Sequence, residues 1–565
     1  MEINVRNIWF FTFAFVLVYI AALPLDVMDV DAAQYASISH EMLKNHSWLQ
    51  VMDRGHDYLD KPPLLFWLAA SSFKIFGVSN WAYKLPSFFF ALLGVFSTAK
   101  LTELLYDKKT GALAGLMLAS GLAVFIMTND VRTDTMLLGA VAFGIWQVLL
   151  YLKTKRWISL VAGFAGIGVA MLAKGPLGLV IPVMALSCEF AYKRQWKNFL
   201  RWQWLVGLGI IAVVLFPMCL GLYRQFDLHP EKTVNGATGV SGLRFYFWTQ
   251  SFGRITGDSD WGTKFDNGAG PFFFTHTFLW AFFPWSFLVI GGLIKRILKL
   301  VKSRFRAGFI HEMLSFGGFV LVFFALSASK YKLPHYIYVT LPFAAMLAAR
   351  FFIYDVFHPA KKYLLIIFSA LHGIFVPALF FVAGLILFFI FPGKNFLAVL
   401  VTSVLLLTAV ILFWKSKTKF EKLLYPLLCG LLAFYFTGNT VFYPNLLSYQ
   451  APAAAGKIIA EKKIPAGNYA NFHDVFRYAN DFYSGYPVRQ VYGGDGSLDS
   501  CFSSSGTAWL FTDAEGRDEL KERGYHFVQE HKLNDYSIQF ITTNFLNPAT
   551  RASVLRERYL LEVSK

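Results

Sequence analysis

The chain has 565 residues, of which 56% are hydrophobic and only 15% are charged. A soluble domain carries about 25% charged residues, so this composition excludes an ordinary soluble enzyme and indicates a polytopic membrane protein. The net charge of +17 would usually suggest a nucleic-acid partner, but it lies mainly in short loops between apolar segments. Membrane topology explains such a distribution, and we expect no nucleic-acid partner.

Apolar windows of about 20 residues, the length that spans a bilayer, recur along the first 440 positions. The first is expected to be a retained signal anchor, because its apolar run is long and no clean small-x-small cleavage site follows it. The windows predict thirteen transmembrane helices, at 8–25, 84–106, 110–128, 134–152, 157–173, 176–192, 204–223, 272–294, 311–328, 334–354, 363–390, 396–414 and 422–441.

Lysine and arginine in the short loops predict the orientation of these helices. Loops on one side are all basic, among them "YKRQWKNFLR" at 192–201 and "KSKTKFEK" at 415–422. Loops on the other side, such as 26–61 and 224–270, are acidic or mixed. The positive-inside rule therefore predicts a cytoplasmic N-terminus. The odd number of spans places the C-terminal tail on the outer side.

The sequence divides into a membrane domain, 1–445, and a tail, 446–565, that we expect to form a small α/β domain on the outer side. Strand-like and helix-like runs alternate in this tail. The strands are predicted at 508–513, 525–530 and 558–563, and the helices at 453–463 and 514–524.

The first outer loop contains "DVMDVDAAQYASISHEML", 26–43. Asp31 and Tyr35 are four residues apart and would share one face of a helix. Tyr35, Ile38 and Met42 form an apolar stripe, which predicts a helix lying on the membrane surface. The alternative is that the acids of this loop are only a solvated exit from the bilayer.

An acid and a base precede two prolines in "YLDKPPLLFW", 58–67. Prolines fit the first turn of a helix, so Asp60 is a candidate N-cap for a short juxtamembrane helix. A helix N-terminus favours anions, and Lys61 adds a full positive charge beside it. The stretch therefore predicts a phosphate site. The alternative is that Asp60 only caps the helix and Lys61 only extends its amine to the interface.

A further outer loop, "MTNDVRTDTML" at 127–137, brings Arg132 and Asp134 to the start of a span. An acid at the edge of the bilayer usually has a partner or a function. The alternative is an Arg132–Asp134 pair that only starts the helix.

Two more outer segments carry cations. "LRFYFWTQSFGRITG", 243–257, predicts another interfacial helix with Arg254 near its end. "SASKYKLPHYIY", 327–338, holds Lys332 and Tyr336, and lysines on the outer side run against the positive-inside bias.

Acids, lysines and arginines thus converge at one membrane surface. This suits an enzyme that uses a lipid-linked phosphate, because cations can hold the phosphate while a carboxylate acts as base on an acceptor hydroxyl. A non-catalytic flippase or transporter of lipid-linked sugars would use the same basic patch. Asp29, Asp31 and Asp134 could gather a divalent ion, but the cations suffice for a monophosphate. We expect no metal and no other cofactor.

Five motifs resemble the bacterial aminoarabinose transferases that modify lipid A, which belong with the protein O-mannosyltransferases among the GT-C glycosyltransferases. The motifs occur in the order of that family, and the proline motif is the most specific. They read "DAAQYASISHEML", "YLDKPPLLFWL", "RTDTML", "GPFFFTHTFLWAFFPW" and "SKYKLPHYIYVTLPF".

The resemblance implies a GT-C membrane domain with interfacial helices, a periplasmic α/β domain after it, and a donor sugar on undecaprenyl phosphate. We therefore expect a glycosyltransferase of the bacterial inner membrane that acts on the periplasmic side and inverts the anomeric centre. Asp31 matches the catalytic carboxylate of the first loop, and Asp134 matches an active-site acid. The positions that match donor-binding residues are Tyr58, Asp60, Lys61, Arg254 and Tyr336, and by their position we add Tyr35, Arg132 and Lys332 as substrate-binding residues.

The chain departs from the family pattern at three places: Ala32 follows Asp31 where many relatives have Glu, Asp60 replaces a common Glu, and "WTQSFGR" lacks a histidine. These differences bear on the sugar and the acceptor more than on the reaction. Lipid A, another envelope glycan and a protein serine or threonine remain open as acceptors.

Overall fold

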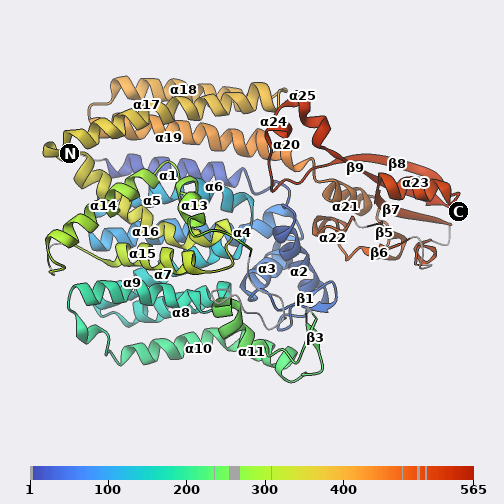
Figure 1. Cartoon of the computed structure of the whole chain (residues 1–565), viewed down its shortest axis with the longest axis horizontal. Coiled ribbons are helices and arrows are strands. Elements are labelled where there is room, and N and C mark those ends of the chain that lie inside the picture. Colours follow the sequence, from blue (N-terminus) through green and yellow to red (C-terminus); the bar gives the residue numbers. More distant parts are fainter. Residues whose placement is uncertain are drawn as a thin grey trace.

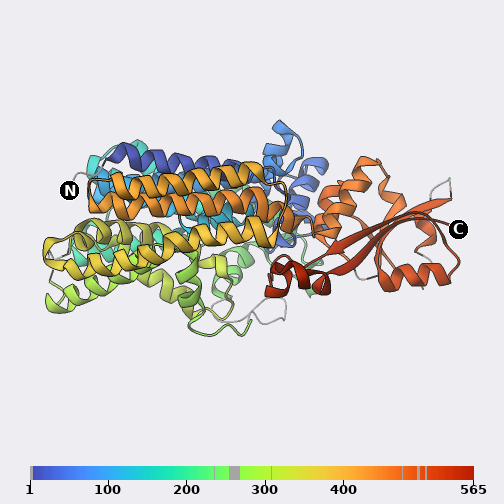
Figure 2. The ribbon, with the colours of Figure 1, turned by 90° about the horizontal axis from the view of Figure 1, so that it is seen from above.

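The computed structural model describes residues 4–234, 236–253, 267–306, 308, 310–473, 475–492, 497–502 and 506–565. Long helices run side by side in a bundle, and a smaller domain with a β-sheet lies at one end of it (Figure 1). The two chain termini lie at opposite ends of the molecule. Seen from above, the bundle and the small domain follow one another along the long axis (Figure 2).

A helix or a pair of consecutive helices lies at each of the thirteen predicted spans. In the described residues, eight helices are long and apolar enough to cross a membrane, or nine if α5 and α6, bent by 51°, form one span. The helical multi-span fold is therefore confirmed, and the count of thirteen stays a prediction. The helices of the bundle are α1 (Val5–Ile20), α4 (Asn80–Leu105), α5 (Lys108–Ala119), α6 (Leu122–Asn129), α7 (Thr133–Thr154), α8 (Trp157–Lys174), α9 (Leu177–Tyr192), α10 (Gln203–Leu222), α13 (Phe273–Ala281), α14 (Ser286–Lys302), α15 (Leu314–Ala328), α16 (Leu341–Phe351), α17 (Lys362–Leu385), α18 (Phe396–Lys415) and α19 (Lys419–Thr437).

Small residues let α7 approach its neighbours closely. A side chain added at Gly139 would collide with the backbone carbonyl of Phe90 on α4. Gly163 on α8 faces Val148 of α7, where an added Cβ would lie 2.9 Å from a methyl group. Close backbone approach through small residues is the usual way in which membrane helices gain packing contacts. It fixes α7, whose first turn carries Asp134.

Two shorter helices, α2 (Asp31–Asn45) and α3 (Leu64–Phe76), lie between the bundle and the small domain (Figure 1). The predicted apolar stripe of α2 exists, but Tyr35 and its neighbours along the stripe are buried. The stripe packs inside the protein because α3 and α22 (Tyr478–Ser484) both contact α2. The expectation that this stripe faces the membrane surface is therefore wrong.

The predicted N-cap role of Asp60 is also wrong. Helix α3 begins at Leu64, its N-cap position is Pro63, and no side chain caps it. The backbone of Asp60 instead accepts a hydrogen bond from the Gln250 amide, at 2.5 Å. Residues 60–62 are thus held outside the helix by a segment far away in the sequence.

The C-terminal domain is a five-stranded mixed sheet of order β6-β5-β7-β9-β8. Three strands that we predicted are present, and the two predicted helices are present as α21 (Ala451–Glu461) and α23 (Ala514–Glu522). The parallel strands β5 and β6 were not predicted. The strands of this sheet are β5 (Tyr469–Phe472), β6 (Arg489–Val491), β7 (Thr507–Asp513), β8 (His526–Asp535) and β9 (Arg556–Ser564).

Shorter elements complete the described chain. Two are hairpins, β1 (Met52–Asp53)–β2 (His56–Asp57) and β3 (Thr233–Val234)–β4 (Ala237–Thr238). The short helices are α11 (Gly242–Arg244), α20 (Tyr443–Leu447), α24 (Thr543–Leu546) and α25 (Pro548–Arg551).

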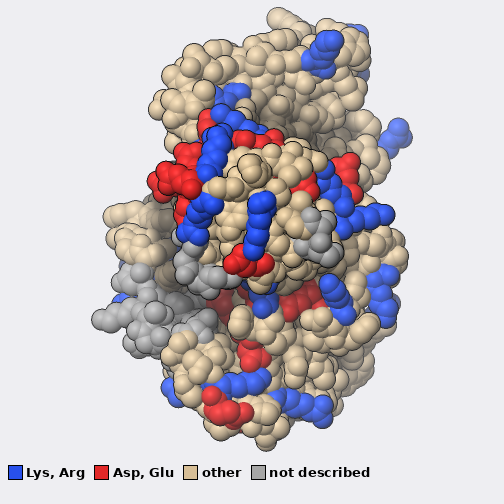
Figure 3. All heavy atoms as spheres, turned by 90° about the vertical axis from the view of Figure 1, so that its right-hand side faces the viewer, with Lys and Arg blue, Asp and Glu red and all other residues tan. Residues whose placement is uncertain are grey.

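Polar contacts join the C-terminal domain to the segment 26–57, which follows α1. Arg54 forms an ion pair with Asp481 of α22 and donates to the carbonyl oxygen of Val488 at 2.8 Å. Lys457 of α21 pairs with Asp26 at 2.6 Å. Viewed from this end, acidic and basic side chains are interspersed on and around the domain, whereas the upper part of the bundle is largely uncharged (Figure 3).

Asp29 is one of these contacts between the domains. Its carboxylate accepts a hydrogen bond from the backbone N–H of Ala479 at 3.2 Å and lies 3.7 Å from the Arg477 guanidinium. Burial raises the pKa of the Asp29 carboxyl from 3.8 to about 6, and the two contacts oppose this shift only in part. The folded protein therefore holds the Asp29 proton more tightly than the unfolded chain does.

The raised pKa of Asp29 predicts that stability falls as pH rises. The contribution is fully present below about pH 4, where the carboxyl is protonated in both states, and is lost as pH passes 6. The shift corresponds to ~3 kcal/mol. We expect Asp29→Asn to flatten this part of the pH dependence of the thermal unfolding midpoint in detergent, whereas Asp518→Asn, at an exposed acid of the C-terminal domain, should not. Equal slopes for wild type and Asp29→Asn would contradict the prediction.

Candidate active site

Asp31, the first residue of α2, forms an ion pair with Arg132. The Arg132 guanidinium also binds Asp130, at 2.8 Å. Burial alone would lower the pKa of Arg132, but Asp130 and Asp31 raise it above its usual value, so the side chain stays charged. The Asp31 side chain is 42% exposed, which leaves it accessible while Arg132 holds it in place.

Asp134 is buried in the first turn of α7 and pairs with Lys174, the last residue of α8. The Lys174 ammonium lies 3.8 Å from the centre of the Tyr336 ring, within the range of a cation–π contact. His335 approaches the other oxygen of Asp134, at 3.7 Å. Three elements that are distant in sequence thus meet around one buried carboxylate. The alternative Arg132–Asp134 pair is not formed in the described structure, because each partner binds another group.

Lys61 lies beside Asp60, with which it forms an ion pair, and Gln250 holds the backbone there. Gln250 belongs to the helical segment Phe245–Gly253, so a helix is present over the described part of 243–257, and its interfacial position stays a prediction. Within the described residues, Gln250 Oε1 and Ser251 Oγ are buried and have no hydrogen-bond partner. Buried polar atoms of this kind are candidates for contact with a ligand.

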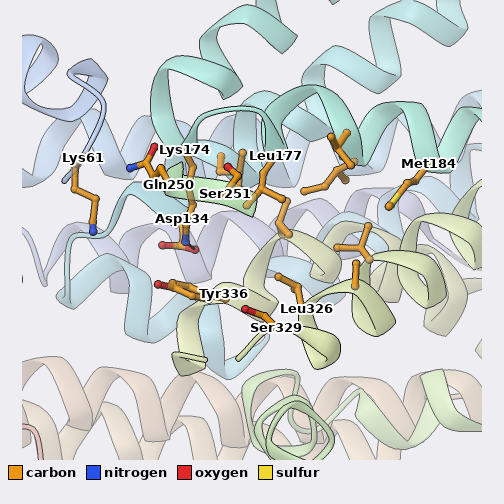
Figure 4. Close-up of a pocket in the computed structure, with 16 residues that line it drawn as sticks. Lys61, Asp134, Lys174, Leu177, Met184, Gln250, Ser251, Leu326, Ser329 and Tyr336 are labelled. Atoms are coloured by element: carbon orange, nitrogen blue, oxygen red, sulfur yellow. Dashed lines mark hydrogen bonds and ion pairs between the residues drawn. The ribbon is translucent and has the colours of Figure 1, made fainter. Parts of the chain in front are cut away.

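A cavity of about 80 Å³ brings these groups together. Lys61, Lys174, Asp134 and Gln250 gather toward one end, as does the hydroxyl of Tyr336 (Figure 4). Most of the remaining lining is apolar and comes mainly from α9 and α15, and Ser251 and Ser329 are its two polar members. The apolar residues are Leu137, Leu177, Val180, Ile181, Met184, Val322, Ala325, Leu326 and Val339. The lining, which is charged at one end and mainly apolar along the rest, matches the chemistry of an amphiphile with an anionic group and a hydrocarbon chain.

Not every predicted site residue lines this cavity. Tyr35 and Tyr58 both pack edge-on against Phe66, each with ring centres 5.9 Å apart. Tyr58 lines a smaller neighbouring hollow together with Lys61. The Lys332 ammonium donates to the carbonyl oxygen of Ala269, at 2.9 Å, and lies outside the lining. Arg254 lies outside the described residues.

The pKa of the Tyr35 hydroxyl responds to burial and to nearby charged groups of the candidate site. Burial, followed by the charges of Asp31 and Asp60, raises the pKa of Tyr35 well above its usual value. Arg132 opposes the shift.

Lys174 and Gln250 are cavity residues that the sequence analysis did not single out. A signal for Lys174 existed: it stands between two predicted spans on the outer side, where a lysine runs against the positive-inside bias. Gln250 carries no such signal, because a glutamine in an aromatic segment is ordinary.

Comparison with known proteins gives a consistent result. Residues 60–220 match a family model described as dolichyl-phosphate-mannose-protein mannosyltransferase. The undecaprenyl phosphate-alpha-4-amino-4-deoxy-L-arabinose arabinosyl transferase of Yersinia pestis (strain Pestoides F) is 27% identical over 349 residues, which are 59% of this chain and 57% of that protein. The protein of the same name from Shewanella sediminis (strain HAW-EB3) is 24% identical over 343 residues, with the same coverage. The match thus spans less than two thirds of these relatives.

Solved structures agree with the sequence relatives. The crystal structure of ArnT from Cupriavidus metallidurans bound to undecaprenyl phosphate matches 99% of this chain and 98% of that chain, with a TM-score of 0.71 and 17% identity. The apo state of the same protein gives a TM-score of 0.67 and 16% identity. The resemblance indicated by the motifs is therefore confirmed, and the chain has the ArnT-like fold.

Proposed function

We propose that this chain, as a homologue of the aminoarabinose transferases, moves a monosaccharide from undecaprenyl phosphate to lipid A or another envelope glycan. The observation that carries the proposal is the cavity with Lys61, Lys174 and Asp134 near one end and apolar walls along the rest. The charge at one end matches a phosphate in chemistry, and the apolar walls match a polyprenyl chain. A protein O-mannosyltransferase-like activity shares this donor chemistry and differs in the acceptor.

The proposed reaction is a direct displacement that inverts the anomeric carbon. An acceptor oxygen forms a bond to this carbon while the bond to the donor phosphate oxygen breaks, and the phosphate leaves with the bonding electrons. Lys61 and Arg254 would hold the leaving phosphate. Asp31 would orient the acceptor and take the proton when the acceptor is a hydroxyl, and Asp134 would support the site together with Lys174.

The proposal includes the finer topology. Thirteen spans would place the N-terminus in the cytoplasm and the active site and C-terminal domain in the periplasm. The basic connectors support this orientation, since they lie at the end of the bundle away from the C-terminal domain, as with 193–201 between α9 and α10 (Figure 1).

The deciding experiment incubates the purified full chain in detergent with a labelled polyprenyl-phosphate sugar and an acceptor. The proposal expects release of free polyprenyl phosphate together with a glycosylated acceptor. Transbilayer movement of the donor in vesicles without bond cleavage would support the flippase or transporter instead. Mass spectrometry of lipid A and of envelope glycoproteins, with and without the gene, would identify the acceptor.

Lys61→Ala is expected to weaken donor binding or slow departure of the phosphate by about ten- to a hundred-fold, the effect of one charge-assisted contact. Lys61→Arg should keep part of the activity because the charge survives while the geometry changes. Lys74→Ala, at an exposed lysine in the last turn of α3, is the matched control and should leave donor binding and turnover unchanged. Unchanged donor affinity with lower thermal stability in Lys61→Ala would leave the lysine a structural role only.

A further inference from the structure

A second hollow lies at the end of the bundle away from the active site. Helices α4, α7 and α9 end around it, and the connector 193–202 between α9 and α10 closes it. Its volume is about 880 Å³. The site proposed above lies near the opposite ends of α7 and α9, so this hollow is separate from the donor cavity.

One wall of the hollow is apolar. Leu104 and Leu105 come from the last turn of α4, and Leu149 and Leu152 come from the last turns of α7. Phe190 of α9 completes this wall. Since these residues belong to helices that run through the bundle, the wall continues toward the hydrocarbon region of a membrane.

The other wall is cationic. Lys153, Arg194, Lys197 and Arg201 line it, and among the described residues none of these four has an ion-pair partner. Arg201 makes only a neutral contact through its Nε, which donates to Asn198 at 2.9 Å.

The one acid in the lining, Glu189, is already engaged. One of its oxygens pairs with Lys193 at 2.5 Å, and the other accepts the backbone N–H groups of Met313 and Leu314 at the start of α15. Its charge is therefore used inside the protein, and the wall keeps an excess of positive charge toward the hollow.

The connector has the character of a membrane interface. Trp196, Leu200 and Trp202 are 62%, 89% and 60% exposed, although they are large apolar residues. Tryptophan at the headgroup level is typical of membrane proteins. The indole of Trp204 donates to the carbonyl oxygen of Asn198 at 2.7 Å, which fixes the connector above the hollow.

We propose that this hollow binds one anionic glycerophospholipid. The phosphodiester would contact Arg194, Lys197 and Arg201, and an acyl chain would lie along the leucines of α4 and α7. An anionic head group is favoured over a zwitterionic one, because a choline or ethanolamine ammonium would meet the same cations and no free carboxylate.

Charge alone does not select this place. A neighbouring hollow of about 620 Å³, between Lys295 and Arg306, is also basic. Its lining contains a single leucine, Leu298, and Lys295 is paired with Asp355. It therefore lacks the apolar wall that an acyl chain requires.

Native mass spectrometry of the full chain in mild detergent tests the proposal, by titration with phosphatidylglycerol and with phosphatidylcholine of the same acyl chains. We expect retention of phosphatidylglycerol in preference to phosphatidylcholine. Neutralising three cations in the variant Arg194→Gln/Lys197→Gln/Arg201→Gln should weaken that binding on the order of 100-fold, since each is worth a few-fold near an anionic head group. Leu152→Trp, which fills the apolar wall without changing the charge, should weaken it too.

The matched control removes the same charge elsewhere on this end of the bundle. Lys415→Gln/Lys417→Gln/Lys419→Gln changes three exposed lysines around the connector between α18 and α19 and should leave binding unchanged. Equal loss in this control, or equal retention of phosphatidylcholine, would overturn the proposal. Displacement of the lipid by an equal concentration of inorganic phosphate would do so as well, in favour of a free-anion site.

Discussion

Asp31→Asn is expected to lower the rate of sugar transfer by about 10²- to 10⁴-fold, the usual contribution of a positioned general base. The amide keeps the size of the side chain but cannot take a proton. The fold should survive, because Arg132 keeps its contact with Asp130 and the Asp31 side chain is half exposed. The measurement is turnover of a labelled donor, with the thermal midpoint recorded on the same preparation.

A matched control for Asp31 stands in the same loop. Asp26 is also an acid bound to a cation, Lys457, but this contact joins the two domains and lies outside the cavity. Asp26→Asn should therefore reduce stability modestly and keep turnover. Full transfer activity in Asp31→Asn would refute the proposed role of Asp31. Equal losses of turnover in Asp31→Asn and Asp26→Asn would mean that Asp31 only supports the structure.

The second large effect concerns the pair of Lys174 and Asp134. Lys174→Met should destabilise the protein by about 3–5 kcal/mol, because it leaves the buried Asp134 carboxylate without its ammonium partner. Asp134→Leu should have a similar effect for the reciprocal reason. The double variant should recover much of the stability, since no unpaired charge remains, while transfer activity stays lost in all three.

Thermal unfolding and transfer assays on the four proteins of this double-mutant cycle measure the prediction. Lys84 provides a comparison, because this lysine is also buried but donates to a backbone carbonyl, that of Ala22, at 3.1 Å. Lys84→Met should destabilise the protein less than Lys174→Met, because it leaves no buried carboxylate unpaired. A double variant as unstable as the sum of its two singles would contradict the pairing.

Much of the fold could be predicted because one-dimensional patterns determine it. Apolar windows located the helices of the bundle, and alternation located β7, β8 and β9. Strand β5 was not predicted because all four of its residues are buried. Its sequence therefore shows no alternation of apolar and polar residues, as is usual for a parallel strand inside a sheet.

The candidate site was only partly predictable. The polar outliers Asp31, Lys61 and Asp134 stood out against an apolar background. Their partners did not, because Lys174 meets Asp134 only after α7 and α8 pack together. The cap assigned to Asp60 failed for a related reason: its backbone is held by Gln250, 190 residues away, which no local rule can detect.

The contacts of the C-terminal domain with the segment 26–57 have a consequence for how such proteins diversify. Asp26, Gln34 and Arg54 reach residues of α21 and α22, and α2 also carries Asp31. The two regions must therefore change together. A chimera that takes residues 446–565 from a relative should fold and function only when the segment of about 26–57 comes from the same parent. Recombination therefore cannot exchange the C-terminal domain by itself.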